Sequence, residues 1–328
     1  MVKTRKKKAI RKNKTRKCVK GKYKINFIKN NIKNYTSLYI LKKGKMILNP
    51  NYLVSKGVKL HNMPSSFTLN KNGVQLLNLN KSENLKKCFN KFKIIDTKRN
   101  SRNFRKCIRR YLKEYMNEFI KYFKKWGNQI GIDYDDLVIV DSVYRNTDKK
   151  VSSPFRSVSA AHIDFDPYMT DYAFIYPFID RWGEKLEKIL GKEIYNKNYW
   201  KIGNPIVKVC NVWISLTEPT IKNDALIFCD LQKFNTKQIV PYIASRRVSG
   251  KKRNDKFIAQ AIKYSANNKW HTKQNMKMGE AYIFDSFKTP HASAHTNAND
   301  CSRQSIECRL LFIKHKSIPK RVNKYYIL

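Results

Sequence analysis

The ten residues "AAHIDFDPYM", 160–169, place one imidazole and two carboxylates at alternate positions: His162, Asp164 and Asp166. Carboxylates are scarce here, since the chain has 24 Asp and Glu against 69 Lys and Arg. Side chains alternate between the two faces of a β-strand, so His162 and Asp164 would share a face and bind one metal ion without bending the backbone. The stretch therefore predicts two ligands of a metal site, with Asp166 either an alternative to Asp164 or a cap of the turn at Pro167.

A third ligand has to come from elsewhere in a chain that has six histidines. The segment "FKTPHASAHTNANDCSRQSIECR", 287–309, offers His291 and His295. Two histidines and one carboxylate on one side of a metal leave other positions open, which suits non-haem Fe(II) better than a closed zinc site. We expect His291 as the third ligand, with His295 as the alternative.

A row of polar side chains follows these histidines. The stretch "HTNAND" is a turn signal, and a hairpin centred near Asn297 would place His291 opposite Arg303 on one face. Steps of two along the strand then put four side chains on that inward face: Arg303, Ser305, Glu307 and Arg309. Burying such a row without partners is costly, and arginine binds carboxylates with a planar pair of donors. The row predicts a dicarboxylate site, while an ion pair between Glu307 and one of the arginines is also expected.

The order of these motifs resembles a known superfamily. HxD, a distal histidine and then RxS is the pattern of Fe(II)/2-oxoglutarate-dependent dioxygenases, and the finer likeness is to the AsaB/CmcJ-type hydroxylase–desaturase family. Similar stretches occur in the family's order from about Asp141 to Ile313: "AHIDFDP", "NVWISLTEP" followed by "ALIFCD", "KWHTKQNMKMGEAYIFDS", "TPHASAH" and "RQSIECRLLF". The chain departs from the family at Ile214 and Ser215, where a basic residue and a proline are usual. That departure puts the family's substrate pocket in doubt, though not the metal ligands.

The resemblance implies a double-stranded β-helix core, also called jelly-roll or cupin-like. Together with the helical periodicity and the charge distribution of the chain, the expected fold is α+β, with flanking helices and a basic N-terminal extension that has no recognised counterpart in the family. It implies Fe(II) bound by His162, Asp164 and His291. It also implies 2-oxoglutarate whose far carboxylate meets Arg303 and Ser305, with Arg309 as a second candidate for that carboxylate or for a substrate anion. Further candidates for contacting the substrate or supporting the ligands are Arg145, Asn211, Trp213, Asp230 and Thr289. The implied activity is an oxidoreductase, a dioxygenase that hydroxylates or desaturates an unidentified substrate.

The net charge of +45 points to a second class of function. Such a field attracts polyanions, and the first acidic residue is Glu83, so the basic N-terminal region is a candidate for nucleic-acid contact. The substrate is therefore expected to be a small molecule or a polyanion. The alternative function is a non-catalytic nucleic-acid-binding or packaging protein that retains the fold.

Cysteine usage and hydropathy bear on the compartment. The seven cysteines are scattered without a CxxC pair, which is typical of reduced thiols. Neither a long apolar run nor a secretory signal is evident. We expect an intracellular protein, in cytoplasm or nucleus, that is not secreted and does not contact a membrane.

Three regions are expected along the chain: a disordered basic tail at 1–22, a basic N-terminal region at 23–132, and an oxygenase domain at 133–328. The second region ends in "SRNFRKCIRRYLKEYMNEFIKYFKKWG", whose apolar residues recur every three or four positions, so we predict an amphipathic helix with Ser101 as N-cap and Gly127 beyond its end. A weaker signal is a hairpin turn at Asn72-Gly73.

The oxygenase domain is expected to consist mainly of short strands, with a second helix at 171–191. The predicted strand segments are "DLVIVDSVY", "NPIVKVCNVWISL", "DALIFCD", "GEAYIFDSF" and "RQSIECRLLFI".

Overall fold

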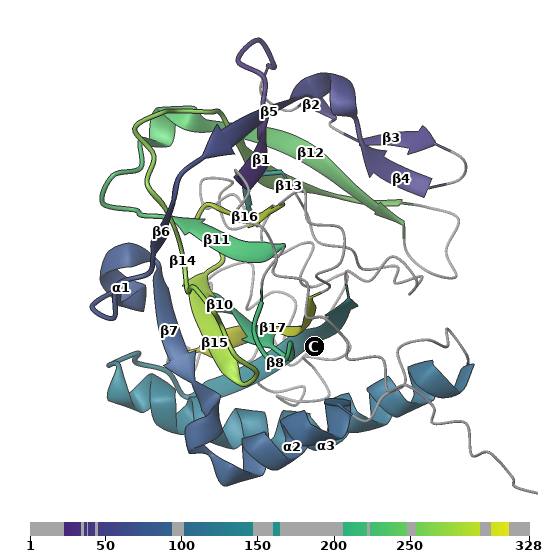
Figure 1. Cartoon of the computed structure of the whole chain (residues 1–328), viewed down its shortest axis with the longest axis vertical. Coiled ribbons are helices and arrows are strands. Elements are labelled where there is room, and N and C mark those ends of the chain that lie inside the picture. Colours follow the sequence, from purple (N-terminus) through teal and green to yellow (C-terminus); the bar gives the residue numbers. More distant parts are fainter. Residues whose placement is uncertain are drawn as a thin grey trace, which may run out of the picture.

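The computed structural model describes residues 23–33, 36–37, 39–42, 45–93, 102–146, 160–164, 206–221, 224–247, 254–295 and 303–314. These residues form a mixed α+β structure, mostly sheet, in which two large sheets face one another (Figure 1). This agrees with the expected α+β class and is consistent with a cupin-like β-sandwich. The predicted tail at 1–22, the second helix at 171–191 and the turn at 296–300 lie outside the described residues.

One face of the sandwich is a five-stranded antiparallel sheet. Its strands in spatial order are β7 (Val74–Asn78), β15 (Glu280–Asp285), β10 (Ile206–Ser215), β17 (Gln304–Ile313) and β8 (Asp136–Asn146). Four of the five apolar runs predicted as strands are found in this sheet, and they occupy its four adjacent positions from β15 to β8.

The opposite face is an eight-stranded sheet, which contains the fifth predicted strand. Its strands in order are β2 (Thr36–Ser37), β12 (Ile239–Arg247), β13 (Asn254–Ile262), β9 (His162–Ile163), β16 (His291–Ala294), β11 (Ala225–Cys229), β14 (Trp270–Thr272) and β6 (Leu60–Asn62). Two smaller pairs are β1 (Tyr23–Ile28) with β5 (Leu53–Val58), and β3 (Tyr39–Lys42) with β4 (Lys45–Leu48). Ile25 and Phe27 of β1 pack with Ile163 and Ala292 in one buried cluster, so this pair covers part of the sheet's outer side.

Helices cover the outer side of the five-stranded sheet (Figure 1). The helical elements are α1 (Leu69–Asn72), α2 (Glu83–Lys93) and α3 (Arg102–Gln129), with 3-10 turns at Pro50–Tyr52, Leu79–Lys81 and Thr236–Gln238. Phe119 and Phe123 of α3 are fully buried in the same cluster as Ile306 and Leu310 of β17. The amphipathic helix is therefore confirmed.

The prediction for the end of that helix was wrong. Gly127 lies inside α3, which continues to Gln129. A Cβ at Gly127 would lie 2.9 Å from ring atoms of Phe312 and Tyr134, so glycine is required there by close packing of the helix.

The hairpin predicted at Asn72-Gly73 was also wrong. Thr68 caps the short helix α1 by accepting a hydrogen bond from the backbone of Lys71, and Gly73 ends it with a φ of 76°. Left-handed backbone after a helical turn is a common role of glycine. The dipeptide therefore terminates a helix instead of joining two strands.

A third correction concerns β16, which carries His291, and β17, which Arg303 directly precedes. They were expected to pair as a hairpin, but β16 pairs with β9 and β11 whereas β17 pairs with β10 and β8. The chain thus crosses from one sheet to the other between these strands. The alternation along β17 was nevertheless right, because Ile306 and Leu310 pack toward the helices while Ser305 lies on the opposite face.

Residues 23–132 contribute β2 and β6 to the eight-stranded sheet and β7 to the five-stranded sheet, so the sandwich uses chain from both sides of the boundary placed at residue 132. Whether that region folds as a separate unit stays a prediction. Within the described residues, no helix is long and apolar enough to cross a membrane.

Candidate metal centre

Two adjacent strands of the eight-stranded sheet bring together His162, Asp164 and His291. The two histidines are direct cross-strand partners on β9 and β16, and their ring centroids are 4.3 Å apart. Asp164 follows β9 directly, with its Oδ1 3.6 Å from His162 Nε2. One ligand atom from each of the three residues lies within 4.8 Å of the others. Among the described residues this is the one such group of three or more, and it is the set expected from the sequence.

Both histidines have the ring orientation that a metal ligand needs. His162 Nδ1 lies 2.8 Å from the carbonyl oxygen of Ala160, and His291 Nδ1 lies 3.0 Å from that of Thr289. A carbonyl can only accept a hydrogen bond, so in each ring Nδ1 carries the proton and Nε2 keeps a free lone pair. Hydrogen bonding of the distal nitrogen in this way fixes the tautomer of metal-binding histidines.

The electrostatics of the cluster favour the forms that bind metal. Burial, together with the neighbouring His162, lowers the pKa of His291 to about 4, so its ring is neutral near pH 7. Burial alone would raise the pKa of Asp164, but the neighbouring imidazoles of His162 and His291 and the guanidinium of Arg309 hold that pKa well below its usual range. Neutral imidazole and ionised carboxylate are the ligand states. The donor set therefore fits a divalent metal ion that accepts nitrogen and oxygen.

The alternative ligands are placed differently. His295 follows β16, but its Nδ1 contacts the carboxylate of Asp224 and its side chain is 40% exposed. It lies outside the cluster of three. Asp166 is outside the described residues.

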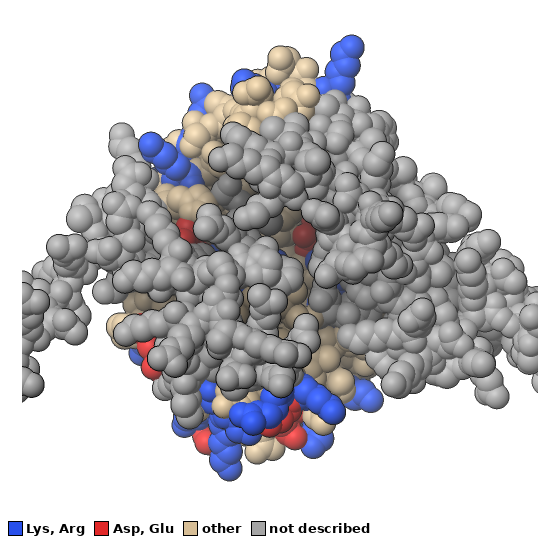
Figure 2. Space-filling model, turned by 90° about the vertical axis from the view of Figure 1, so that its right-hand side faces the viewer, with Lys and Arg blue, Asp and Glu red and all other residues tan. Residues whose placement is uncertain are grey.

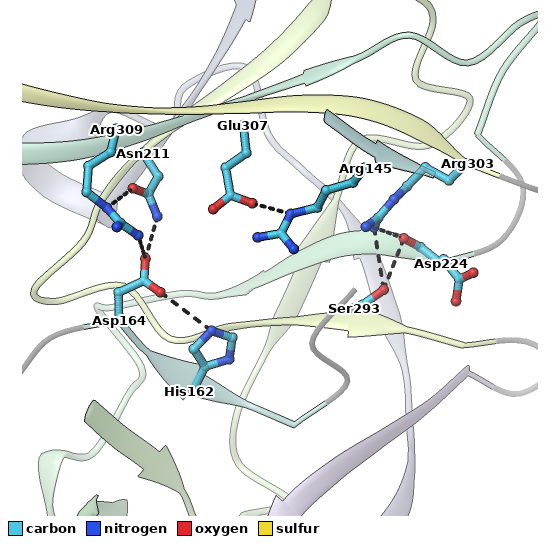
Figure 3. Close-up of polar contacts among 9 residues, drawn as sticks. All are labelled: Arg145, His162, Asp164, Asn211, Asp224, Ser293, Arg303, Glu307 and Arg309. Carbon is cyan, nitrogen blue, oxygen red and sulfur yellow. Dashed lines mark hydrogen bonds and ion pairs between the residues drawn. The ribbon is translucent and has the colours of Figure 1, made fainter. Parts of the chain in front are cut away.

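The second oxygen of Asp164 is held from the opposite sheet (Figure 3). The amide nitrogen of Asn211 donates to Asp164 Oδ2, and Arg309 Nη2 lies 3.5 Å from the same oxygen. Arg309 Nε also donates to Asn211 Oδ1 at 3.0 Å. Asn211 and Arg309 therefore lie beside Asp164. The expected roles, Asn211 as a residue that contacts the substrate or supports the ligands and Arg309 as an arginine for 2-oxoglutarate or a substrate anion, stay predictions.

Arg145 lies between the two other arginines and binds Glu307 (Figure 3). Its Nε donates to Glu307 Oε2 at 2.8 Å, and both side chains are about one-fifth exposed. Burial by itself would raise the pKa of Glu307, but the guanidinium of Arg145 holds it below its usual value. An ion pair of Glu307 was expected with Arg303 or Arg309, and the partner found is an arginine from β8.

Arg303 and Ser305 are two further buried polar residues on the inner face. Arg303 is 2% exposed, and its Nη1 donates to the carbonyl oxygen of Asp224 and lies 3.4 Å from Ser293 Oγ. Its guanidinium stacks over the ring of Trp213 with 5.1 Å to the centroid. Burial lowers the pKa of Arg303 to about 10, which keeps it charged near pH 7.

The hydroxyl of Ser305 is fully buried and has no hydrogen-bond partner among the described residues. A buried polar group without a partner costs free energy unless a ligand or water satisfies it. Ser305 therefore marks a position where a polar ligand atom would be stabilised.

The side chains of two of the remaining candidates bind other segments of the chain. Asp230 accepts hydrogen bonds from Asn72 Nδ2 and the backbone of Gln232, which ties a turn together after β11. Thr289 donates its hydroxyl to the carbonyl of Gly73, and its own carbonyl meets His291. Thr289 thus supports a ligand through its backbone.

Ile214 and Ser215, where the chain departs from the family pattern, lie on opposite faces of β10. Ile214 is buried toward the helices, in the same cluster as Ile306, so it does not face the metal centre. Ser215 pairs with Ser305 across the sheet and is fully buried.

Sequence reasoning missed the partners that Arg303 has on the other sheet. Ser293 carried a usable signal, because it follows His291 by two residues and so shares its face of β16. Asp224 contacts Arg303 through its backbone carbonyl, and no side-chain pattern could have identified it.

Comparisons with known proteins agree with this architecture. A family described as "Oxidoreductase/YMDC permease-like domain" matches residues 25–313. The iron and alpha-ketoglutarate-dependent endoperoxidase NvfI is similar in structure, with a TM-score of 0.61 and 14% identity over 90% of this chain and 98% of that chain. A second structure of NvfI, in a different conformation, gives a TM-score of 0.61 with the same identity and coverage. No curated protein matches the sequence. At this identity the likeness to NvfI shows a shared fold.

Proposed function

We propose that this chain, which belongs to the oxidoreductase/YMDC permease-like domain family, is an Fe(II)- and 2-oxoglutarate-dependent oxygenase. The observation that carries the proposal is the group formed by His162, Asp164 and His291, with both imidazole Nε2 atoms left free to bind. Two histidines and one carboxylate are the facial ligand set of non-haem iron oxygenases. NvfI, which shares the fold, is by its name an iron and alpha-ketoglutarate-dependent enzyme.

Arg303 and Ser305 are the proposed site for the far carboxylate of 2-oxoglutarate. Arg303 contacts Ser293, which follows His291 by two residues on the same face of β16, a separation of about 7 Å along the strand. A short dicarboxylate can therefore reach from the metal ligands to the guanidinium. The buried hydroxyl of Ser305 would then find an acceptor.

The remaining residues of the site would orient the reactants and exclude water. Phe284 and Phe228 flank His291 at ring-centroid distances of 4.8 and 6.3 Å, and Trp213 packs in the same buried cluster. Because apolar side chains such as these exclude water, they strengthen the electrostatic interactions of Arg303 and Asp164 with bound groups. When bound, Fe(II) and 2-oxoglutarate supply an oxygen-dependent oxidation of a substrate C–H bond that converts 2-oxoglutarate to succinate.

Hydroxylation or desaturation of a small molecule is the proposed outcome, in line with the resemblance to AsaB/CmcJ-type enzymes. A polyanionic substrate is the alternative that the net charge of +45 favours. Both substrate classes belong in a screen once turnover of 2-oxoglutarate is established.

The test is an anaerobic titration of the purified protein with Fe(II) and 2-oxoglutarate, followed by admission of oxygen and a succinate assay. We expect a weak visible charge-transfer band and succinate in the wild type. His162→Ala should lose both because a metal ligand is gone. Arg303→Ala should weaken 2-oxoglutarate binding at least about tenfold, since a charged hydrogen bond contributes about 1.5–3 kcal/mol.

Arg110→Ala on the exposed side of α3 is the matched control and should behave as the wild type. A folded wild type that binds Fe(II) yet forms neither the band nor succinate would refute the proposal.

The rival function is non-catalytic binding of nucleic acid, which the net charge of +45 supports. It predicts that binding to any duplex weakens steeply as salt rises. Such binding without succinate formation would favour the rival, whereas succinate formation that depends on His162 would exclude a non-catalytic protein.

A further inference from the structure

Three side chains form a connected polar group that joins the two sheets at the metal centre (Figure 3). Asp164 comes from the eight-stranded side, after β9, and Asn211 and Arg309 come from the five-stranded sheet. Asn211 and Arg309 are direct cross-strand partners on β10 and β17, so their side chains share a face. That face is the inner one, because Val212 and Leu310 beside them pack toward the helices.

The hydrogen bonds determine how the Asn211 amide and the Asp164 carboxylate are oriented. Arg309 Nε donates to Asn211 Oδ1 at 3.0 Å, which means that the oxygen of the amide faces the arginine. The amide nitrogen of Asn211 must then face Asp164, where it donates to Oδ2. Arg309 Nη2 reaches the same oxygen at 3.5 Å. Two donors thus converge on one oxygen of the carboxylate.

The other oxygen of Asp164 is oriented toward the ligand atoms. Oδ1 lies 3.6 Å from His162 Nε2, the ring nitrogen that carries no proton. With Oδ2 occupied by Asn211 and Arg309, the carboxylate presents Oδ1 to the cluster.

We propose that Asn211 and Arg309 are positioning residues that hold Asp164 as a one-oxygen metal ligand. The proposal rests on the proposed function for the identity of the metal. It also separates the two arginines, since Arg309 would serve the metal ligand and Arg303 the co-substrate. Without the two donors, Asp164 would turn freely after its short strand or bind the ion through both oxygens, and the affinity of the site would fall.

An arginine is needed at 309 for a geometric reason. Its planar fork reaches Asn211 through Nε and Asp164 through Nη2 at the same time. Lysine has one nitrogen and cannot make both contacts with that geometry. Arg309→Lys should therefore behave like a loss of the interaction although the charge is kept.

The experiment measures the Mn(II) affinity of the full-length protein without 2-oxoglutarate, and then the 2-oxoglutarate affinity at saturating Mn(II). Asn211→Ala, Arg309→Gln and Arg309→Lys should each weaken Mn(II) binding by about 10- to 100-fold, as is usual when a partner of a metal ligand is lost. The double variant of Asn211→Ala with Arg309→Gln should bind no more weakly than about the worse single variant, because the two residues act as one unit. Asn211→Ser replaces Asn211→Ala if the latter does not fold.

Arg303→Gln is the crossed comparison and should show the opposite pattern, with Mn(II) affinity kept and 2-oxoglutarate affinity lowered. Asn84→Ala and Arg110→Gln, on exposed faces of α2 and α3, are the matched controls for loss of an amide and of a guanidinium. A general loss of structure would lower both affinities together, so the crossed pattern distinguishes positioning from folding.

Mn(II) affinity in the Asn211 and Arg309 variants equal to wild type would overturn the inference. So would a loss of 2-oxoglutarate affinity alone in Arg309→Gln, which would make Arg309 a co-substrate residue. A wild type that binds Mn(II) but never forms succinate refutes only the proposed function, because the metal affinities of the variants still decide the role of Asn211 and Arg309. A wild type that binds no Mn(II) overturns both.

Discussion

At the scale of single residues, backbone carbonyls and side chains from the other sheet orient the proposed metal ligands. The carbonyls of Ala160 and Thr289 each lie two residues before one of the two histidines and accept a hydrogen bond from its Nδ1. This repeat follows from strand geometry, since residues i and i+2 lie on one side of a strand. The same alternation explains why the sequence could identify His162 and Asp164 as a pair.

A histidine outside the centre should contribute to a loss of stability below about pH 6.5. Burial lowers the pKa of His271 below its usual 6.5, and its ring packs 5.0 Å from Phe67. As the pH falls below about 6.5, the unfolded chain binds a proton at His271 before the folded protein does. The free energy of unfolding should therefore decrease until the pH passes the lowered pKa of the folded state. The added slope is at most about 1.4 kcal/mol per pH unit. Above about 6.5 the group should have no effect.

Urea unfolding of the wild type and His271→Phe at several pH values checks this. Phenylalanine has a similar shape and no titrating group, so the variant should show a smaller loss of stability on acidification. Equal pH dependence in the two proteins would contradict the role assigned to His271.

At the scale of elements, the short helix α1 and its following turn support the strand that carries His291. Thr289 donates its hydroxyl to the carbonyl of Gly73, and Gly73 accepts a further hydrogen bond from the backbone of Asp285. The turn at Gly73, which the sequence predicted to close a hairpin, thus connects α1 and β7 to the segment before β16.

Gly73→Ala should destabilise the fold. Its φ of 76° is unfavourable for alanine, and the new Cβ would lie 2.5 Å from Leu231 Cδ1 and from Thr289 Oγ1. The left-handed conformation alone costs about 1–2 kcal/mol, and the contacts add to this. Urea unfolding measures the loss.

Gly57→Ala in β5 is the matched control, because a Cβ there meets nothing within 4 Å. It should leave stability unchanged or raise it slightly by restricting the unfolded chain. A Gly73 variant as stable as the Gly57 variant would show that the turn tolerates a side chain.

At the scale of the whole molecule, the sandwich buries its polar site between two sheets while the chain carries a net charge of +45. At the lower edge of the face in Figure 2, Lys and Arg side chains (blue) lie beside Asp and Glu side chains (red). Lysines on the described surface are partly compensated, as where Lys91 meets Glu114 at 2.7 Å and Lys314 meets Asp133 at 2.7 Å. Exposed ion pairs of this kind contribute about 0–1 kcal/mol each. Repulsion among the remaining charges should therefore oppose folding.

Added NaCl should raise the melting temperature, because screening shortens the range of repulsion to about 8–10 Å near physiological ionic strength. A thermal melt at low and moderate NaCl checks this. The double variant Lys87→Glu with Lys113→Glu, both on exposed helix positions, should melt higher than wild type at low salt and respond less to NaCl. A melting temperature that is independent of salt in wild type would show that net charge does not limit stability.

The sequence by itself determined features that depend on neighbours within a few positions. The spacing of Phe119 and Phe123 identified α3, the alternation of His162 and Asp164 identified a shared face, and steps of two along β17 identified its polar side. Each follows from the fixed period of a helix or a strand, which is a local property of the backbone.

Only the tertiary structure decided which of these faces meet. It separated His291 and Arg303 into different sheets and joined Glu307 to Arg145, which is 162 positions away along the chain. It brought Asn211 to Asp164 across 47 positions. Such contacts depend on how the sheets and helices pack as a whole, and no local period encodes the register of one sheet against another.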